Sequence, residues 1–136
     1  DARTPAGPDI EAILRAATDV DGITVAGVAV PDADPSTLRA LGDRMRGRLD
    51  SAVLVAATTG NGRMEVIVMA TPGAVARGAE ARRVMQVLNR RLGTRGGGRA
   101  ELAQGGGGDP SRLPSVLADI GAVVREALAG SAAGRG

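Results

Sequence analysis

The sequence predicts an α/β or α+β fold: a single compact layer formed by a sheet of three to four strands with helices packed on it. Apolar runs of strand length alternate along the chain with segments whose apolar residues recur at helical spacing. The length of 136 residues suits one domain, and an apolar fraction of 43% is sufficient for a core. We expect a linker over residues 1–8, one domain over 9–130 and a disordered tail over 131–136.

The first third of the chain predicts a helix, a buried strand and a second helix. Asp9 and Asp34 are each suited to cap a helix, and Asp34 is followed by a proline at the first helical position. Between them lies a run that is apolar on both faces of a strand, which is typical of a buried position. These signals predict a helix over 9–20, a strand over 22–30 and a helix over 34–50.

The rest of the chain predicts a hairpin, a long helix, a glycine-rich loop and a final helix. Asn61-Gly62 is a two-residue hairpin signal between the apolar runs 52–57 and 64–70. Thr71-Pro72 begins a helix that we expect to run to residue 92, where Gly93 stops it. A loop over 93–108 follows. Asp109-Pro110 begins the final helix, and Pro114 predicts that its first turn is 3₁₀.

Six residue types are absent, and their absence excludes several kinds of chemistry. The chain has no Cys for a disulfide or a thiolate, and no His for a general base or a neutral metal ligand. It has no Lys for a Schiff base, and no Phe, Tyr or Trp on which a nucleic-acid base could stack. Pairs such as Asp19/Asp21 and Asp32/Asp34 are explained by turns and caps. We therefore expect no catalysis, no cofactor and no metal in this chain on its own.

The charge is distributed unevenly although the net charge is only +2. Residues 1–36 carry two arginines against seven acids, whereas residues 76–112 carry eight arginines against three acids. Such polarity favours one basic face that binds a polyanion, although solvated helix faces explain many charge runs. No run reaches the roughly 18 apolar residues of a membrane span, so we expect a cytoplasmic, soluble chain.

The segment 90–108 is the most informative one, since eight glycines lie within residues 93–108 next to arginines. Glycine N–H groups can point at an anion, and flanking arginines can bind a phosphate through two hydrogen bonds. Two other interpretations stay open: a close approach of two backbones, or a flexible linker. The candidate RNA-binding residues are Arg83, Arg90, Arg91, Arg95, Gly96, Gly97, Gly98, Arg99 and Gln104.

The run from Gly96 to Gly106, followed by Asp109-Pro110, closely resembles the glycine-rich signature near the end of alanyl-tRNA synthetases. It departs from the family pattern at Ala100, where proline is usual, and at Glu101, where aspartate is usual. The resemblance extends over about residues 20–128, and the domain is related to the one associated with DHH-type phosphoesterases. In those enzymes the glycine motif typically carries a histidine, which this chain lacks.

The resemblance implies a DHH-associated-domain-like fold that contacts the outer elbow of a tRNA, here an alanine-specific one, by phosphate and shape. It implies partner domains of an alanyl-tRNA synthetase if the chain is a fragment, an interpretation that its start at Asp1 rather than Met allows. Two alternatives stay open. The chain could be a subunit-assembly module that forms a homodimer, or the substrate-binding half of a phosphoesterase.

Overall fold

The computed structural model describes residues 10–60 and 62–135. The expected linker over 1–8, the Asp9 cap and Asn61 of the hairpin signal lie outside these residues. The described chain folds into six strands and six α-helices, with one 3₁₀ turn. In chain order the elements are α1 (Ile10–Arg15), β1 (Thr18–Val20), β2 (Ile23–Ala29), α2 (Pro35–Arg46), β3 (Ala52–Gly60), β4 (Arg63–Ala70), α3 (Pro72–Ala76), α4 (Ala81–Leu92), β5 (Thr94–Gly98), β6 (Leu102–Gly107), η1 (Pro110–Arg112), α5 (Leu113–Ala118) and α6 (Ile120–Arg135).

All six strands form one sheet in the order β1-β2-β3-β4-β6-β5. The pair β2–β3 is parallel and is connected through α2, and every other neighbouring pair is antiparallel. The mixed α and β class is therefore confirmed, but the sheet has six strands where three to four were expected. The additional strands come from the segments 18–20 and 94–107, where a helix and a loop were expected.

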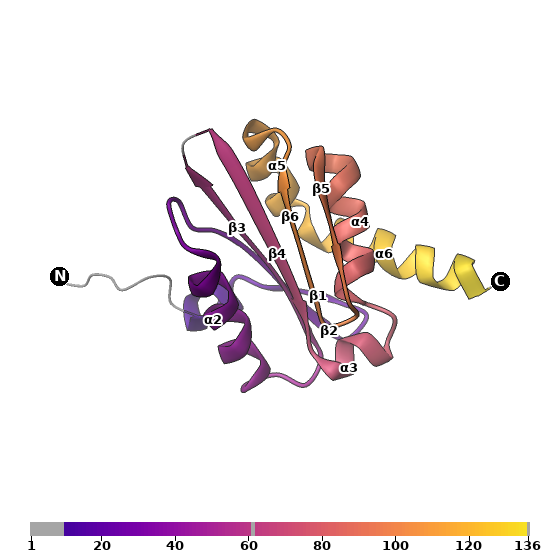
Figure 1. Cartoon of the computed structure of the whole chain (residues 1–136). Helices are drawn as coiled ribbons and strands as arrows, with labels where there is room; N and C mark the ends of the chain where they lie inside the picture. Colours follow the sequence, from indigo (N-terminus) through magenta and orange to yellow (C-terminus); the bar gives the residue numbers. More distant parts are fainter. Residues whose placement is uncertain (1–9, 61, 136) are drawn as a thin grey trace.

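Helices cover the two faces of this sheet unequally, as Figure 1 shows. The larger core lies between the sheet and α3 to α6, and it includes Val55, Val68 and Leu88. The smaller core lies under α1 and α2, and it includes Leu38 and Leu54. Gly42 lets α2 approach closely, because a Cβ there would overlap the Met69 side chain on β4. Among the described residues, α2 packs mainly on β3 and β4, so the second face is less covered at β6 and β5.

The strand β1 corrects the expected helix over 9–20. The helix ends at Arg15, and Thr18–Val20 then pairs with β2. Asp21 and Gly22 connect the two strands with φ values of 52° and 86°. Two successive positive φ values are the signature of a tight hairpin turn, and Asp-Gly is a favoured sequence for it. The signal was therefore present in the sequence.

The long helix expected over 72–92 is two helices. Thr71 caps α3 by accepting a hydrogen bond from the Ala74 N–H, which agrees with the expected start. The helix ends after Ala76, and Gly78 has a φ of 99° that a helix does not contain. A new helix, α4, begins at Ala81 and ends at Leu92, and the left-handed φ of 79° at Gly93 confirms the predicted stop.

The C-terminal part confirms one prediction and differs from another. The final helical segment begins with the 3₁₀ turn η1 before the regular helix α5, as Pro114 predicted. Where a disordered tail over 131–136 was expected, the backbone of α6 stays helical through Arg135. The segment is rich in alanine, the best helix former, which outweighs the two glycines at positions 130 and 134.

Candidate nucleic-acid interface

The glycine-rich segment is a β-hairpin, which corrects the predicted loop and the flexible-linker interpretation. Strands β5 and β6 pair in antiparallel register from Thr94↔Gly107 to Gly98↔Ala103. Strand β6 also pairs with β4, so the hairpin is an integral part of the sheet. Its outer strand, β5, is an edge strand. The arginines of this segment therefore project from an ordered backbone.

Three of the glycines are required by the close approach of the two strands. A Cβ at Gly96 would overlap Gly105 and the Gln104 carbonyl, and a Cβ at Gly98 would overlap the Leu102 carbonyl and Ala103. Gly105 is equally confined by Arg95 and Gly96 on β5. The close-approach interpretation is thus confirmed for these positions. It does not extend to Gly97, which has no atom within 4 Å of its Cβ position.

Alternation along the two strands places the polar side chains on one face. Ala103 is buried in the larger core, so its partner Gly98 faces α4 as well. Gly97 pairs with Gln104, and Arg95 with Gly106, so these residues face the opposite side. Arg99 continues the same alternation, and its N–H donates to the Leu102 carbonyl at 2.7 Å. We name this surface, formed by Arg95, Gly97, Arg99 and Gln104, the hairpin face.

The hairpin face contains unpartnered charge. The side chains of Arg95 and Arg99 are exposed, and neither makes a hydrogen bond or ion pair within the described residues. Their Cα atoms are four residues apart on extended chain, about 13 Å. That spacing suits two separate phosphates better than the single phosphate expected from the sequence. Arg39 of α2 extends the surface, because its Nη2 donates to Gln104 Oε1 at 3.2 Å.

Hydrogen bonds from α4 hold the hairpin in place. The Asn89 side-chain amide donates to the Gly96 carbonyl at 3.0 Å, and Thr94 Oγ1 donates to Asn89 Oδ1 at 2.8 Å. Because the Gly96 carbonyl bonds to Asn89, Gly96 and Gly105 form a non-hydrogen-bonded pair of the ladder. The N–H groups of Gly96 and Gly98 therefore point away from β6, toward the free edge of the sheet.

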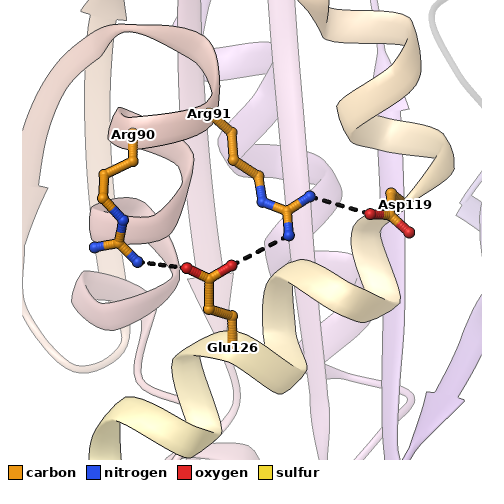
Figure 2. A network of polar contacts seen from close by, with 4 residues as sticks. All are labelled: Arg90, Arg91, Asp119 and Glu126. Atoms are coloured by element: carbon orange, nitrogen blue, oxygen red, sulfur yellow. Dashed lines mark hydrogen bonds and ion pairs between the residues drawn. The ribbon is translucent and has the colours of Figure 1, made fainter.

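Arg90 and Arg91 lie on the other side of the sheet, where α4 packs on α6 (Figure 2). Arg90 pairs with Glu126 at 2.6 Å, and Arg91 pairs with Asp119 at 3.0 Å and with Glu126 at 3.1 Å. Hydrogen bonds from Arg90 and then Arg91 lower the pKa of the Glu126 carboxyl. The hydrogen bond to Asp119, followed by the one to Glu126, raises the pKa of Arg91. We name these four residues the α4–α6 network.

Arg83 is also separated from the hairpin face. It lies on α4 with a half-buried side chain, and its Nε is 3.7 Å from a carboxylate oxygen of Glu80. Within the described residues, this buried Nε–H donates no hydrogen bond. The nine residues predicted as one site are therefore divided. The structure groups Arg95, Gly97, Arg99 and Gln104, and it places Arg83, Arg90 and Arg91 on α4.

Sequence reasoning missed Arg39. It lies 65 positions before Gln104, and no local pattern connects the two residues. Only the docking of α2 on β4 brings them together. Among the described residues, no group of three or more Asp or Glu side chains is arranged to hold a metal ion. None of the described helices combines the length and apolarity of a membrane span.

Comparison with known proteins agrees with this architecture. The family model described as the DHHA1 domain matches residues 21–126. Alanine–tRNA ligase of Myxococcus xanthus is 36% identical over 113 residues, which cover 83% of this chain and 13% of that protein. The ligase of Geobacillus kaustophilus is 35% identical over 109 residues, covering 80% of this chain and 12% of that protein. The chain thus spans about an eighth of the length of these relatives.

The fold is also that of a solved domain. The C-Ala domain from Aquifex aeolicus alanyl-tRNA synthetase superposes with a TM-score of 0.71 at 25% identity, over 79% of this chain and 96% of that one. A DHH domain of a member of the s1p family of ribosomal proteins shares the fold alone, with a TM-score of 0.52 at 15% identity. The sequence match and the shared sheet architecture agree, and the chain belongs to the DHHA1 domain family and resembles the non-catalytic C-Ala domain of alanyl-tRNA synthetase.

Proposed function

We propose that this chain is a non-catalytic tRNA-binding module and that the hairpin face contacts the elbow of an alanine tRNA. The observation that carries the proposal is the pair Arg95 and Arg99, both exposed and unpartnered within the described residues, on either side of Gly97. Free guanidinium groups bind phosphate through charge-assisted hydrogen bonds. The resemblance to the C-Ala domain supports the choice of tRNA as the polyanion.

The mode of recognition follows from what the surface offers. Gly97 lets an RNA backbone approach the sheet, because no side chain separates the two. The outward N–H groups of Gly96 and Gly98 add donors at the neighbouring edge. Since the chain has no aromatic residue, bases cannot stack on a ring. Binding at the hairpin face itself therefore depends on phosphate contacts and on the shape of the folded RNA. Ligase chemistry would belong to other domains of a longer protein.

A charge-reversal experiment tests the proposal. The chain is titrated with intact alanine tRNA, and Arg95→Glu and Arg99→Glu are measured singly and together. A hydrogen bond to a charged group contributes about 1.5–3 kcal/mol, so each change is expected to weaken binding at least about tenfold. Arg125→Glu is the matched control, because Arg125 is exposed on α6, across the sheet, and has no partner within the described residues. An equal loss of tRNA affinity in Arg95→Glu, Arg99→Glu and Arg125→Glu would contradict binding through one defined surface.

Two further measurements define the mode of binding. The slope of log affinity against log salt is expected to fall by about 1.4–1.8 in the Arg95→Met/Arg99→Met double variant, as two phosphate contacts disappear. Intact tRNA is expected to bind more tightly than an isolated acceptor minihelix, because the minihelix has no elbow. Equal affinity for the two RNAs would exclude the elbow as the contact.

Subunit assembly is a second candidate, favoured by the free edge of β5. An edge strand with exposed main-chain groups is a template for pairing with another strand. Sedimentation at several protein concentrations tests this function. A tight dimer that ignores tRNA would support assembly, and a monomer that binds tRNA would exclude it.

A further inference from the structure

A hollow of about 340 Å³ lies on the second face of the sheet, at the N-terminal end of α2. It is lined by Asp32, Ala33, Thr58, Gly60, Arg63 and Glu65. Thr58 follows Leu54 and Ala56 in the alternation along β3, and both of these pack under α2. The hollow therefore opens on the same side of the sheet as the hairpin face.

The register of the sheet connects this hollow to the hairpin face. Arg95 pairs with Gly106, Gly106 with Glu65, and Glu65 with Thr58. These four residues form one row across β5, β6, β4 and β3. Gly106 has no side chain, so none stands between Arg95 and Glu65. The strands β5 and β4 are two strand spacings apart, about 10 Å. An RNA with a phosphate at Arg95 can therefore place the base of an adjacent nucleotide at the hollow.

The walls of the hollow carry charged groups that do not satisfy one another. Asp32, Arg63 and Glu65 are exposed, and none makes a side-chain hydrogen bond or ion pair within the described residues. The backbone beneath them is fixed, because Asp32 N–H donates to the Thr59 carbonyl at 2.9 Å and Ala33 N–H donates to Thr58 Oγ1 at 2.8 Å. Two carboxylates against one guanidinium give a formal charge of −1, which disfavours a phosphate.

We infer that this hollow binds an unpaired guanine base of the RNA that occupies the hairpin face. Guanine presents adjacent N–H donors, N1 and N2, and a carboxylate is an acceptor with two oxygens. It also presents the acceptors O6 and N7, which match an arginine side chain. Arg63 and Glu65 lie two residues apart on β4 and so project on the same side. Uracil has one N–H donor and lacks this double match. The inference rests on the proposed function, since it requires RNA on the neighbouring surface.

The test compares short single-stranded RNAs by fluorescence anisotropy. The probes are the pentamers UUGUU, UUIUU and UUUUU, where I is inosine, which lacks the N2 amine. The wild-type chain is expected to bind UUGUU about tenfold more tightly than UUUUU, with UUIUU between them. Equal affinity for UUGUU and UUUUU would overturn the inference.

Variants assign the preference to the hollow. The Asp32→Asn/Glu65→Gln double variant is expected to reduce the ratio of the two affinities to near one, and asparagine tolerates the positive φ of 56° at position 32. Glu101→Gln is the matched control, because it removes one carboxylate from the turn of the same hairpin and should leave the ratio unchanged. A ratio that survives the double variant would overturn the inference.

The two proposals fail in different ways. If the chain binds tRNA through Arg95 and Arg99 but shows no preference among the pentamers, only the guanine site is wrong. If neither tRNA nor any pentamer binds, the proposed function is wrong and the guanine site falls with it. Arg95→Glu should weaken all three pentamers by the same factor, because it removes a phosphate contact and no base contact.

Discussion

The α4–α6 network and the hairpin face both carry arginines, which are paired with carboxylates in the network and unpaired among the described residues on the hairpin face. Every arginine of α4 has an acidic partner: Arg82 and Arg83 share Glu80, and Arg90 and Arg91 share Glu126. Across the sheet, Arg95 and Arg99 have none within the described residues. The difference shows that a count of arginines in a segment does not measure the charge available to a partner.

Helix packing explains the difference. The helix α6 packs against α4 and presents Glu126 to the arginines of α4, and Asp119, between α5 and α6, lies against Arg91. Among the described residues, the opposite face is covered by α1 and α2, which pack mainly on β2, β3 and β4, so Arg95 and Arg99 on the hairpin stay exposed. A phosphate would have to compete with carboxylates at Arg90 and Arg91, whereas no carboxylate of the described residues pairs with Arg95 or Arg99.

The largest expected effect distinguishes two adjacent glycines of the hairpin. Gly96→Ala forces a methyl group into the backbone of β6, and such overpacking costs about 1–3 kcal/mol of unfolding free energy. Gly97→Ala points into open space and is expected to stay within about 0.5 kcal/mol of the wild type. Urea unfolding of both variants measures this. Equal destabilisation would mean that the strands do not approach closely at Gly96.

A larger substitution at Gly97 tests its role in RNA binding separately from its role in stability. If RNA approaches the sheet at Gly97, the larger change Gly97→Val weakens tRNA binding while the urea midpoint stays near that of wild type. The affinity is measured by filter binding at one fixed salt concentration. Unchanged affinity would place the RNA away from this residue.

A smaller effect compares one arginine from each surface. Arg91→Met removes the partner of Asp119 and one of the two partners of Glu126, so the urea midpoint should fall measurably. Arg95→Met removes no partner and should leave the midpoint unchanged. Because exposed ion pairs are screened by salt, the loss in Arg91→Met should shrink at high salt. If Arg95→Met lowered the urea midpoint and Arg91→Met did not, the assignment of a structural role to Arg91 and not to Arg95 would be wrong.

The smallest effect is a pH dependence confined to the α4–α6 network. The pKa of Glu126 is lowered below its ordinary value of 4.5, mainly by the hydrogen bond from Arg90. Its contribution to stability is therefore present above the pKa of the unfolded chain and is lost as the pH falls through the folded pKa. An NMR titration of the Glu126 carboxyl should give a pKa below 4.5, and Arg90→Ala should raise it. A wild-type pKa at or above 4.5 would contradict the network.

Local signals in the sequence predicted many of the elements. The apolar runs predicted the strands β2, β3 and β4, and Asp34-Pro35 predicted the start of α2. Gly93 predicted the end of α4. Asp21-Gly22 carries a hairpin signal, but a helix expected through residue 20 leaves no strand before it that could pair with the strand over 22–30. The hairpin of β5 and β6 could not be recognised by alternation, because glycine has no side chain and so gives no apolar pattern.

The sequence by itself determined the mixed α and β class, the family and the exclusion of thiol, imidazole and amine chemistry, because these depend on residue identity and local order. Only the tertiary structure decided which arginines are available. That outcome depends on contacts between residues far apart in the chain, such as Arg90 with Glu126 and Arg39 with Gln104. Strand pairing and helix docking create those contacts, and no local spacing encodes them.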